Sequence, residues 1–166
     1  MSQNIISPSN EDPKYTSVFL AGGITNCKNW QKEVIKELND IEKLTIYNPR
    51  RTNFDLSNKY INHEQMEWEF ERLEKMDIFS MYFCGGTSIQ PICMYELGRN
   101  IVRMQNRFPS DWEKRIVISC EVDYIRKHDV IVQTLLATQN KVFVEHNATP
   151  EMHAYYIKRA IRKIER

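Results

Sequence analysis

Short apolar runs typical of buried strands alternate along this chain with longer segments of helical periodicity. Strands are expected at 17–21, 44–47, 78–83, 115–119 and 141–144, and helices at 30–38, 63–76, 91–104 and 150–164. Such alternation is typical of a parallel sheet that is covered by helices on both faces. We therefore predict an α/β fold, and five strands favour a flavodoxin-like (Rossmann-like) order.

Two glycine-containing turns mark the place where such a sheet would bind a ligand. In open α/β sheets, ligands bind beyond the carboxyl ends of the strands, at the point where the winding order reverses. That point falls here between the first and third expected strands. Gly22-Gly23 follows the first of these strands and the segment 84–90 follows the third, so both turns are predicted to border the site.

The N-terminal composition and the chain length indicate the domain organisation. Residues 1–14 are rich in Ser, Asn and Pro and are expected to form a flexible tail, which leaves 15–166 as a single domain. A domain of about 150 residues can bury a sufficient hydrophobic core without disulfide bonds or a structural metal.

Composition excludes several classes of partner. The 23 Lys+Arg are balanced by 22 Asp+Glu, so the chain lacks the basic surplus of proteins that bind polymeric nucleic acid. No apolar run approaches the roughly 20 residues of a membrane helix, and the N-terminus has no signal-peptide pattern. The cysteines and histidines show no zinc spacing. We expect a cytoplasmic protein with reduced thiols, no metal site and no membrane partner.

Two glutamates occupy positions that helical periodicity assigns to apolar side chains. Glu96 falls inside the apolar stripe of the segment 91–104, and Glu69 interrupts the stripe of the segment 63–76. A carboxylate on an apolar face costs several kcal/mol unless it is compensated. Each glutamate could be a partly buried side chain that reaches water or an arginine. Because both lie on helices flanking the predicted site, paired-carboxylate chemistry is favoured.

A carboxylate pair of this kind suits transfer of a sugar. One carboxylate attacks the anomeric carbon and holds the sugar as a covalent glycosyl ester. The second protonates the leaving group and later removes a proton from the acceptor. Neither step requires a metal or an organic cofactor, and the chain has no glycine-rich phosphate loop of the GxGxxG or GxxxxGK[ST] type.

Five motifs in order resemble the nucleoside 2-deoxyribosyltransferase-like family, especially its branch typical of phage and bacterial small proteins. The resemblance covers roughly residues 16–145, and the motifs are 18–24 (VFLAGGI), 47–51 (YNPRR), 65–69 (QMEWE), 76–78 (MDI) and 95–98 (YELG). It implies a flavodoxin-like fold and transfer of 2-deoxyribose from one nucleobase to another, or to water in nucleotide-hydrolase relatives.

The resemblance also implies roles for single residues. Glu96 matches the nucleophile, and Glu69 matches the acidic residue that handles the base and its proton. The turn of Gly22, Gly23 and Ile24 is similar to the one that brings backbone close to the substrate. The partners implied are a nucleoside or nucleotide and a free nucleobase, with no cofactor.

Some positions depart from the founding enzymes of this family. Gln90 stands where those enzymes carry a base-contacting acidic residue, and an amide both donates and accepts, so the base edge it reads would differ. Phe19 replaces a strand tyrosine. Asp129 matches a sugar-contacting residue donated by another subunit, which would require a homo-oligomer.

Four further residues allow two interpretations each. Arg51 could bind a 5′-phosphate or orient a carboxylate, Glu96 included, or it could be a solvated turn residue. Asp77 is interpreted as an anchor for the start of a strand, rather than as a chemical group. Trp30 and Trp68 could stack on a base, but tryptophans on a helix face more often belong to the core.

These observations lead to three functional interpretations. The first is a nucleoside 2-deoxyribosyltransferase that acts through a glycosyl ester of Glu96. The alternative is an N-glycosidase that hydrolyses 2′-deoxynucleoside 5′-monophosphates with the same nucleophile. A second alternative, from another class, is a non-catalytic nucleotide-binding module on the same fold.

Overall fold

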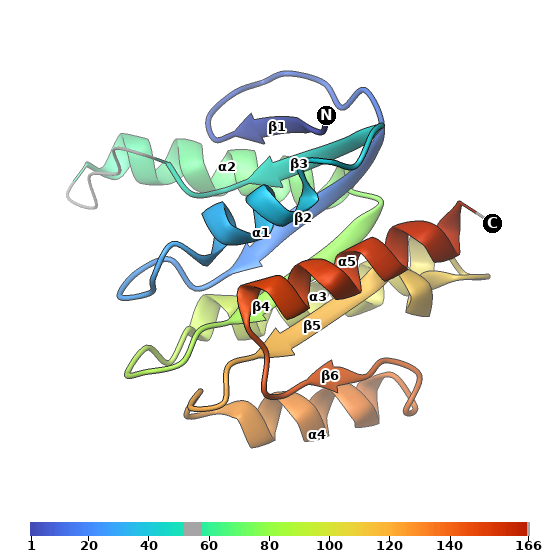
Figure 1. Ribbon diagram of the computed structural model, residues 1–166. Helices are drawn as coiled ribbons and strands as arrows, with labels where there is room; N and C mark the ends of the chain where they lie inside the picture. Colours follow the sequence, from blue (N-terminus) through green and yellow to red (C-terminus); the bar gives the residue numbers. More distant parts are fainter. Residues whose placement is uncertain (52–57, 166) are drawn as a thin grey trace.

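A parallel sheet lies between two layers of helices in the computed structural model, which describes residues 1–51 and 58–165 (Figure 1). The strands in chain order are β1 Gln3–Ile6, β2 Thr16–Gly22, β3 Leu44–Asn48, β4 Ile78–Phe83, β5 Ile116–Cys120 and β6 Val144–Glu145. The helices are α1 Trp30–Leu38, α2 Lys59–Lys75, α3 Pro91–Arg107, α4 Lys127–Ala137 and α5 Pro150–Ile164, with a 3-10 turn at Trp112–Arg115.

The sheet order is β1-β3-β2-β4-β5-β6, and every pairing is parallel. The five strands expected from the sequence are present in the flavodoxin-like order, but the last lies at Val144–Glu145 instead of 141–144. Expecting five strands was wrong, because β1 adds a sixth strand at the edge, from within the segment expected to be a tail. Only Ile5 of this strand is buried. The strand therefore lacks the run of buried apolar residues by which a strand is recognised in a sequence.

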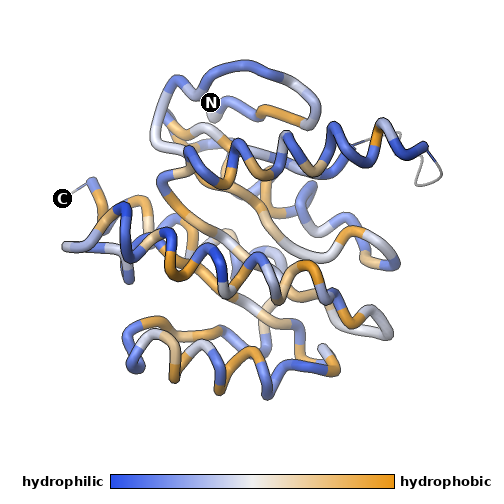
Figure 2. The backbone as a smooth tube through the Cα atoms, turned by 180° about the vertical axis from the view of Figure 1, so that it is seen from behind, coloured by the Kyte–Doolittle hydropathy of each residue, from blue (hydrophilic) through white to orange (hydrophobic). Residues whose placement is uncertain are grey.

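Alternate residues of the central strands supply two separate hydrophobic cores. In β2, Val18 and Leu20 pack under α1 and α5, whereas Phe19 and Ala21 pack toward α2, α3 and α4. Seen from behind, the central strands are mostly hydrophobic, whereas hydrophilic stretches dominate the helices (Figure 2). This is the pattern expected for a sheet with both faces covered.

Two helices differ from expectation. α2 begins at Lys59 instead of residue 63, because the Asn58 side chain caps it by accepting hydrogen bonds from the next backbone N–H groups. α4 was not expected, since it buries only Val130 and Thr134 and leaves Leu136 exposed. Its apolar side chains therefore follow no single face, and the periodicity that identifies a surface helix is weak.

A histidine is fully buried beneath the sheet. His153 of α5 lies between two strand serines, at 2.7 Å from Ser80 Oγ through Nε2 and at 2.7 Å from Ser119 Oγ through Nδ1. The rings of Trp30 and Tyr82 enclose it. Burial away from water lowers the pKa of His153 to about 3.

This histidine should make the fold sensitive to acid. Its pKa in the unfolded chain is near 6.5, so between about pH 6.5 and 3 the unfolded state binds a proton that the folded state does not. The contribution of neutral His153 to the free energy of unfolding is therefore fully present above about pH 6.5. Below that pH this contribution falls, by up to about 1.4 kcal/mol per pH unit. His153→Gln, which cannot titrate, should lose less stability between pH 7 and 5 in urea unfolding. Parallel losses in both proteins would contradict this account.

No helix in the described ranges is long and apolar enough to cross a membrane.

Candidate active site

A cleft opens at the carboxyl ends of β2 and β4, where the strand order reverses. The loops that follow these two strands lie side by side at one edge of the sheet (Figure 1), and Ser88 Oγ donates to Thr25 O across them at 3.3 Å. The cleft has a volume of about 430 Å³ and is lined by both loops together with α2 and α3. An adjoining hollow of about 580 Å³ extends it along α2 toward Arg51.

The turn after β2 depends on its two glycines. Gly22 has a φ of +151°, and a Cβ there would lie 2.2 Å from the carbonyl oxygen of Tyr82 in the neighbouring strand. A Cβ on Gly23 would lie 2.4 Å from Oε1 of Gln90. The Trp30 indole N–H donates to Gly23 O at 2.9 Å and holds the turn from below. The missing side chains thus allow the two loops to meet.

Gln90 closes the loop after β4 with its side-chain amide. Its Nε2 donates to the carbonyl oxygens of Cys84 at 2.8 Å and Ser88 at 3.2 Å, and its Oε1 accepts from the Cys84 N–H at 3.3 Å. The residue is buried and has a left-handed backbone, with φ 47°. The base contact predicted for Gln90 would require it to give up bonds that shape the loop.

Arg50 performs the same function for the loop after β2. Its guanidinium donates to the carbonyl oxygens of Lys28 at 2.8 Å, Cys27 at 2.8 Å and Ile24 at 3.3 Å, and to Gln31 Oε1 at 3.1 Å. One arginine therefore satisfies several backbone groups that form no strand or helix.

Glu69 of α2 and Glu96 of α3 both line the cleft, each partly buried. Burial, followed by the nearby charge of Glu69, raises the pKa of Glu96 to about 7, although Arg99 opposes this rise. Burial also raises the pKa of Glu69, against a hydrogen bond from Gln65 and the charge of Arg51. The charge of Glu69 therefore favours the protonated form of Glu96, which keeps its proton to near neutral pH.

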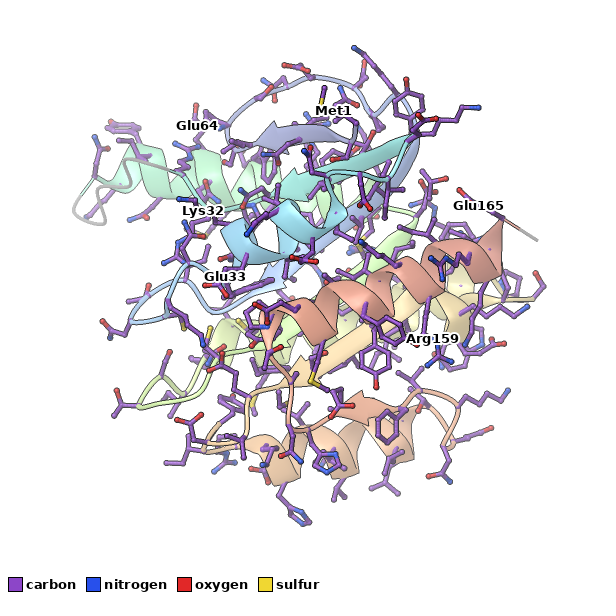
Figure 3. All side chains as sticks on the ribbon, in the orientation of Figure 1. Met1, Lys32, Glu33, Glu64, Arg159 and Glu165 are labelled. Carbon is purple, nitrogen blue, oxygen red and sulfur yellow. The ribbon has the colours of Figure 1, made fainter. Side chains whose placement is uncertain are left out.

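Glu69 is held by groups from its own helix and from the N-terminal segment. Gln65 Nε2 donates to Glu69 Oε1 at 2.6 Å and to Pro49 O at 2.8 Å. Gln65 Oε1 accepts from the Ser7 hydroxyl at 2.6 Å, and the Ser7 oxygen accepts from Arg51 Nε at 3.1 Å. Arg51 also pairs with Glu64 at 2.8 Å, which projects outward from α2 (Figure 3).

The donors expected for Glu96 are not in place. Within the described ranges, no hydrogen bond or ion pair reaches the Glu96 carboxylate. Arg51, named as a candidate donor, bonds instead to Ser7 and Glu64, and its charge acts on Glu69. It turns toward α2 because Glu64 and Ser7 supply acceptors there.

A pair of thiols lies behind the turn. A hydrogen bond from Cys84 is the largest cause that lowers the pKa of Cys27 to about 7, and Ser88 and Arg50 add to it. On α3, burial and the charges of Glu96 and Glu69 raise the pKa of Cys93.

Most of the residues predicted for the site meet in one place. Glu69, Glu96, Gly22, Gly23, Ile24 and Gln90 all line the cleft, and Arg51 lines its extension. Asp129 lies elsewhere, in the groove between α3 and α4, and pairs with Arg126 at 2.8 Å. Within one chain it does not reach the cleft, so its predicted sugar contact still depends on a second copy.

The other residues with two interpretations have structural roles. Trp30 and Trp68 are buried in the core. Asp77 anchors the start of β2, since its Oδ2 accepts from the N–H and the hydroxyl of Ser17 at 2.9 and 3.0 Å.

Sequence reasoning missed Ser7 and Gln65. Gln65 is four residues before Glu69 and therefore shares its helix face, a signal that could have identified it. Ser7 had no signal, because it lies in the segment expected to be a tail, 58 positions from its partner Gln65.

The family of the chain follows from comparison with known proteins. A search of curated proteins finds no match. The model of the family described as "Nucleoside 2-deoxyribosyltransferase like" matches residues 15–109. This range includes β2, β4, both helices of the cleft and both carboxylates, but ends before Asp129. The chain belongs to the nucleoside 2-deoxyribosyltransferase-like family.

Proposed function

We propose that this protein transfers 2-deoxyribose between nucleobases through a glycosyl ester on Glu96, with Glu69 as the acid and base. One observation carries the proposal: two carboxylates from different helices meet in a cleft where the winding order reverses, and the charge of one acts on the other. Membership of the family supports the class of substrate.

The reaction would proceed in two displacements. In the first, a Glu96 oxygen bonds to C1′ while the C1′–N bond breaks, and Glu69 gives its proton to the departing base. In the second, a nitrogen of the incoming base bonds to C1′, the ester bond to Glu96 breaks, and Glu69 takes up the proton. A 2-deoxy sugar lacks the electron-withdrawing hydroxyl beside C1′, so its oxocarbenium-like transition state forms more easily.

The proposed roles require one proton on the two carboxylates. A nucleophile must be ionised and an acid must be protonated, so the productive state has the proton on Glu69 and none on Glu96. Without substrate, burial and the charge of Glu69 favour the proton on Glu96 instead, so binding of the nucleoside has to move it to Glu69. Both pKa shifts point upward because the cleft is shielded from water. The pair therefore keeps its last proton to near neutral pH, and the pH profile of kcat/KM should be bell-shaped.

Intact-protein mass spectrometry tests the proposal directly. The protein mixed with deoxyadenosine should gain the mass of one deoxyribosyl group, and Glu96→Gln should gain none. Adding free cytosine should discharge the adduct and yield deoxycytidine. A wild-type protein that releases no base from any deoxynucleoside and forms no adduct would contradict transfer, and retained binding would then favour the non-catalytic module.

A second candidate function is hydrolysis of 2′-deoxynucleoside 5′-monophosphates. The observation that favours it is Arg51, which lines the extension of the cleft beside Glu69 and whose guanidinium, paired with Glu64 in this structure, is a cation suited to a phosphate. Free deoxyribose phosphate formed with and without an acceptor base would indicate this activity.

A homo-oligomer is also part of the proposal. Exposed apolar side chains lie on the two helices of the cleft, α2 and α3: Met66, Phe70, Ile92 and Tyr95 are each about half to two-thirds exposed. Arg99 lies over the rings of both Phe70 and Tyr95, which joins these residues into one patch. A second copy packed there would cover apolar surface that a monomer exposes to water.

A further inference from the structure

We propose that Gln65 is a positioning residue for Glu69: oriented by Pro49 and Ser7, it holds one carboxylate oxygen and leaves the other facing the cleft. The inference rests on the proposed role of Glu69 in the reaction. It concerns a residue and an N-terminal segment to which that reaction assigns no function.

The direction of the Gln65 amide is determined by its partners. The Pro49 carbonyl can only accept, and it lies 2.8 Å from Nε2. Glu69 Oε1, at 2.6 Å from the same nitrogen, also accepts. Reversing the amide would place its oxygen against two other oxygens, so Gln65 must present an N–H to Glu69. Both hydrogens of the amide are then used.

Ser7 fixes the other end of the amide. Its hydroxyl donates to Gln65 Oε1 at 2.6 Å and accepts from Arg51 Nε at 3.1 Å. Donation therefore runs in one direction from Arg51 through Ser7 and Gln65 to Glu69. A cation at the start of such a chain polarises each following bond toward the carboxylate.

The segment after β1 holds this arrangement against α2. Ser7 is buried, and its N–H donates to Asn48 O at 3.1 Å. Two residues on, the Ser9 carbonyl accepts from Trp68 Nε1 at 2.7 Å and from Arg72 Nη2 at 3.2 Å. The segment that follows the edge strand β1 thus anchors the helix that carries Glu69.

Glu69 Oε1 is occupied while Oε2 forms no hydrogen bond within the described part of the chain. The free oxygen is therefore the one available for the proton of the base. Holding a reacting group in one orientation matters, because a misplacement of about 1 Å can cost about 100-fold in rate.

The test compares Gln65→Leu and Ser7→Ala with Ser9→Ala as the matched control. The Ser9 hydroxyl accepts only a weak, exposed bond at 3.4 Å from the Glu11 N–H, and its carbonyl is unchanged by the substitution. With deoxyadenosine and cytosine as substrates, Gln65→Leu should lower kcat by about 10-fold or more while KM changes by less than about 3-fold. Ser7→Ala should show a smaller loss, and Ser9→Ala none.

The pH profile separates positioning from a general structural effect. The titratable groups that face Glu69 are Arg51, after β3, and Glu96 and Cys93, on α3. Losing the Gln65 donor makes ionised Glu69 less stable, so the carboxylate pair keeps its last proton to higher pH. The alkaline limb should move upward in Gln65→Leu and Ser7→Ala. A limb that coincides with that of the wild type would overturn the proposal.

Carbon-13 NMR titration of the Glu69 carboxyl gives a readout without turnover. Its pKa should rise in Gln65→Leu and Ser7→Ala and stay unchanged in Ser9→Ala. If the wild type turns over no nucleoside, the proposed function fails, yet this titration still decides the positioning. If Gln65→Leu does not fold, as judged by circular dichroism, Ser7→Ala decides it, and an unmoved Glu69 signal there overturns it.

Discussion

Glu96→Gln is expected to abolish transfer, with kcat/KM lower by at least about 10³-fold, because an amide oxygen cannot form the glycosyl ester. The fold should persist, since no hydrogen bond within the described ranges depends on the Glu96 carboxylate. Removing a partly buried acid from the cleft should even raise the unfolding temperature slightly. The measurements are steady-state exchange between deoxyadenosine and cytosine, and a thermal melt.

Glu71→Gln provides the matched control for Glu96→Gln. Glu71 is an exposed residue of α2, and the same change of charge there should leave kcat/KM within about twofold. If both variants lose activity equally, the net charge of the molecule rather than a nucleophile is responsible. If Glu96→Gln retains full activity, Glu96 is not the nucleophile.

The sheet could be predicted because its central strands are buried on both faces. Such strands are nearly continuous apolar runs, as in β2 and β4, and their pattern needs no knowledge of the neighbours. β1 and α4 lack this property. β1 buries one side chain at the edge, and α4 leaves Leu136 exposed, so only pairing and packing with distant elements reveal them.

The carboxylate pair could be predicted for a related reason. A glutamate on an apolar helix face violates the pattern of its own helix, and the topology brings two such helices to one edge. The hydrogen-bond partners around Glu69 leave no comparable signal in the sequence. Ser7 meets Gln65 across 58 positions, and Arg51 donates to Ser7 and Glu64 rather than to Glu96. Contacts of that kind depend on three-dimensional packing, which hydrophobic periodicity does not encode.

Gly22→Ala should destabilise the protein strongly. A Cβ there would meet the backbone oxygen of Tyr82 at 2.2 Å and the Trp30 ring at 2.7 Å, and its φ of +151° is unfavourable for alanine. A carbonyl fixed between β2 and β4 cannot move aside as the end of a long side chain can. We expect a loss of about 2–5 kcal/mol, measured by urea unfolding.

Gly98→Ala is the control for this substitution and should have the opposite sign. Gly98 lies within α3, and a Cβ there meets nothing within 4 Å. The same methyl group should stabilise the protein by about 0.5–1 kcal/mol, because alanine loses less backbone freedom than glycine on entering a helix. Equal destabilisation by both substitutions would show that an added methyl group, not the contact between the strands, is the cause. A Gly22→Ala protein as stable as the wild type would mean that β2 and β4 can separate at their carboxyl ends, and the cleft would then lack the rigid floor that its chemistry requires.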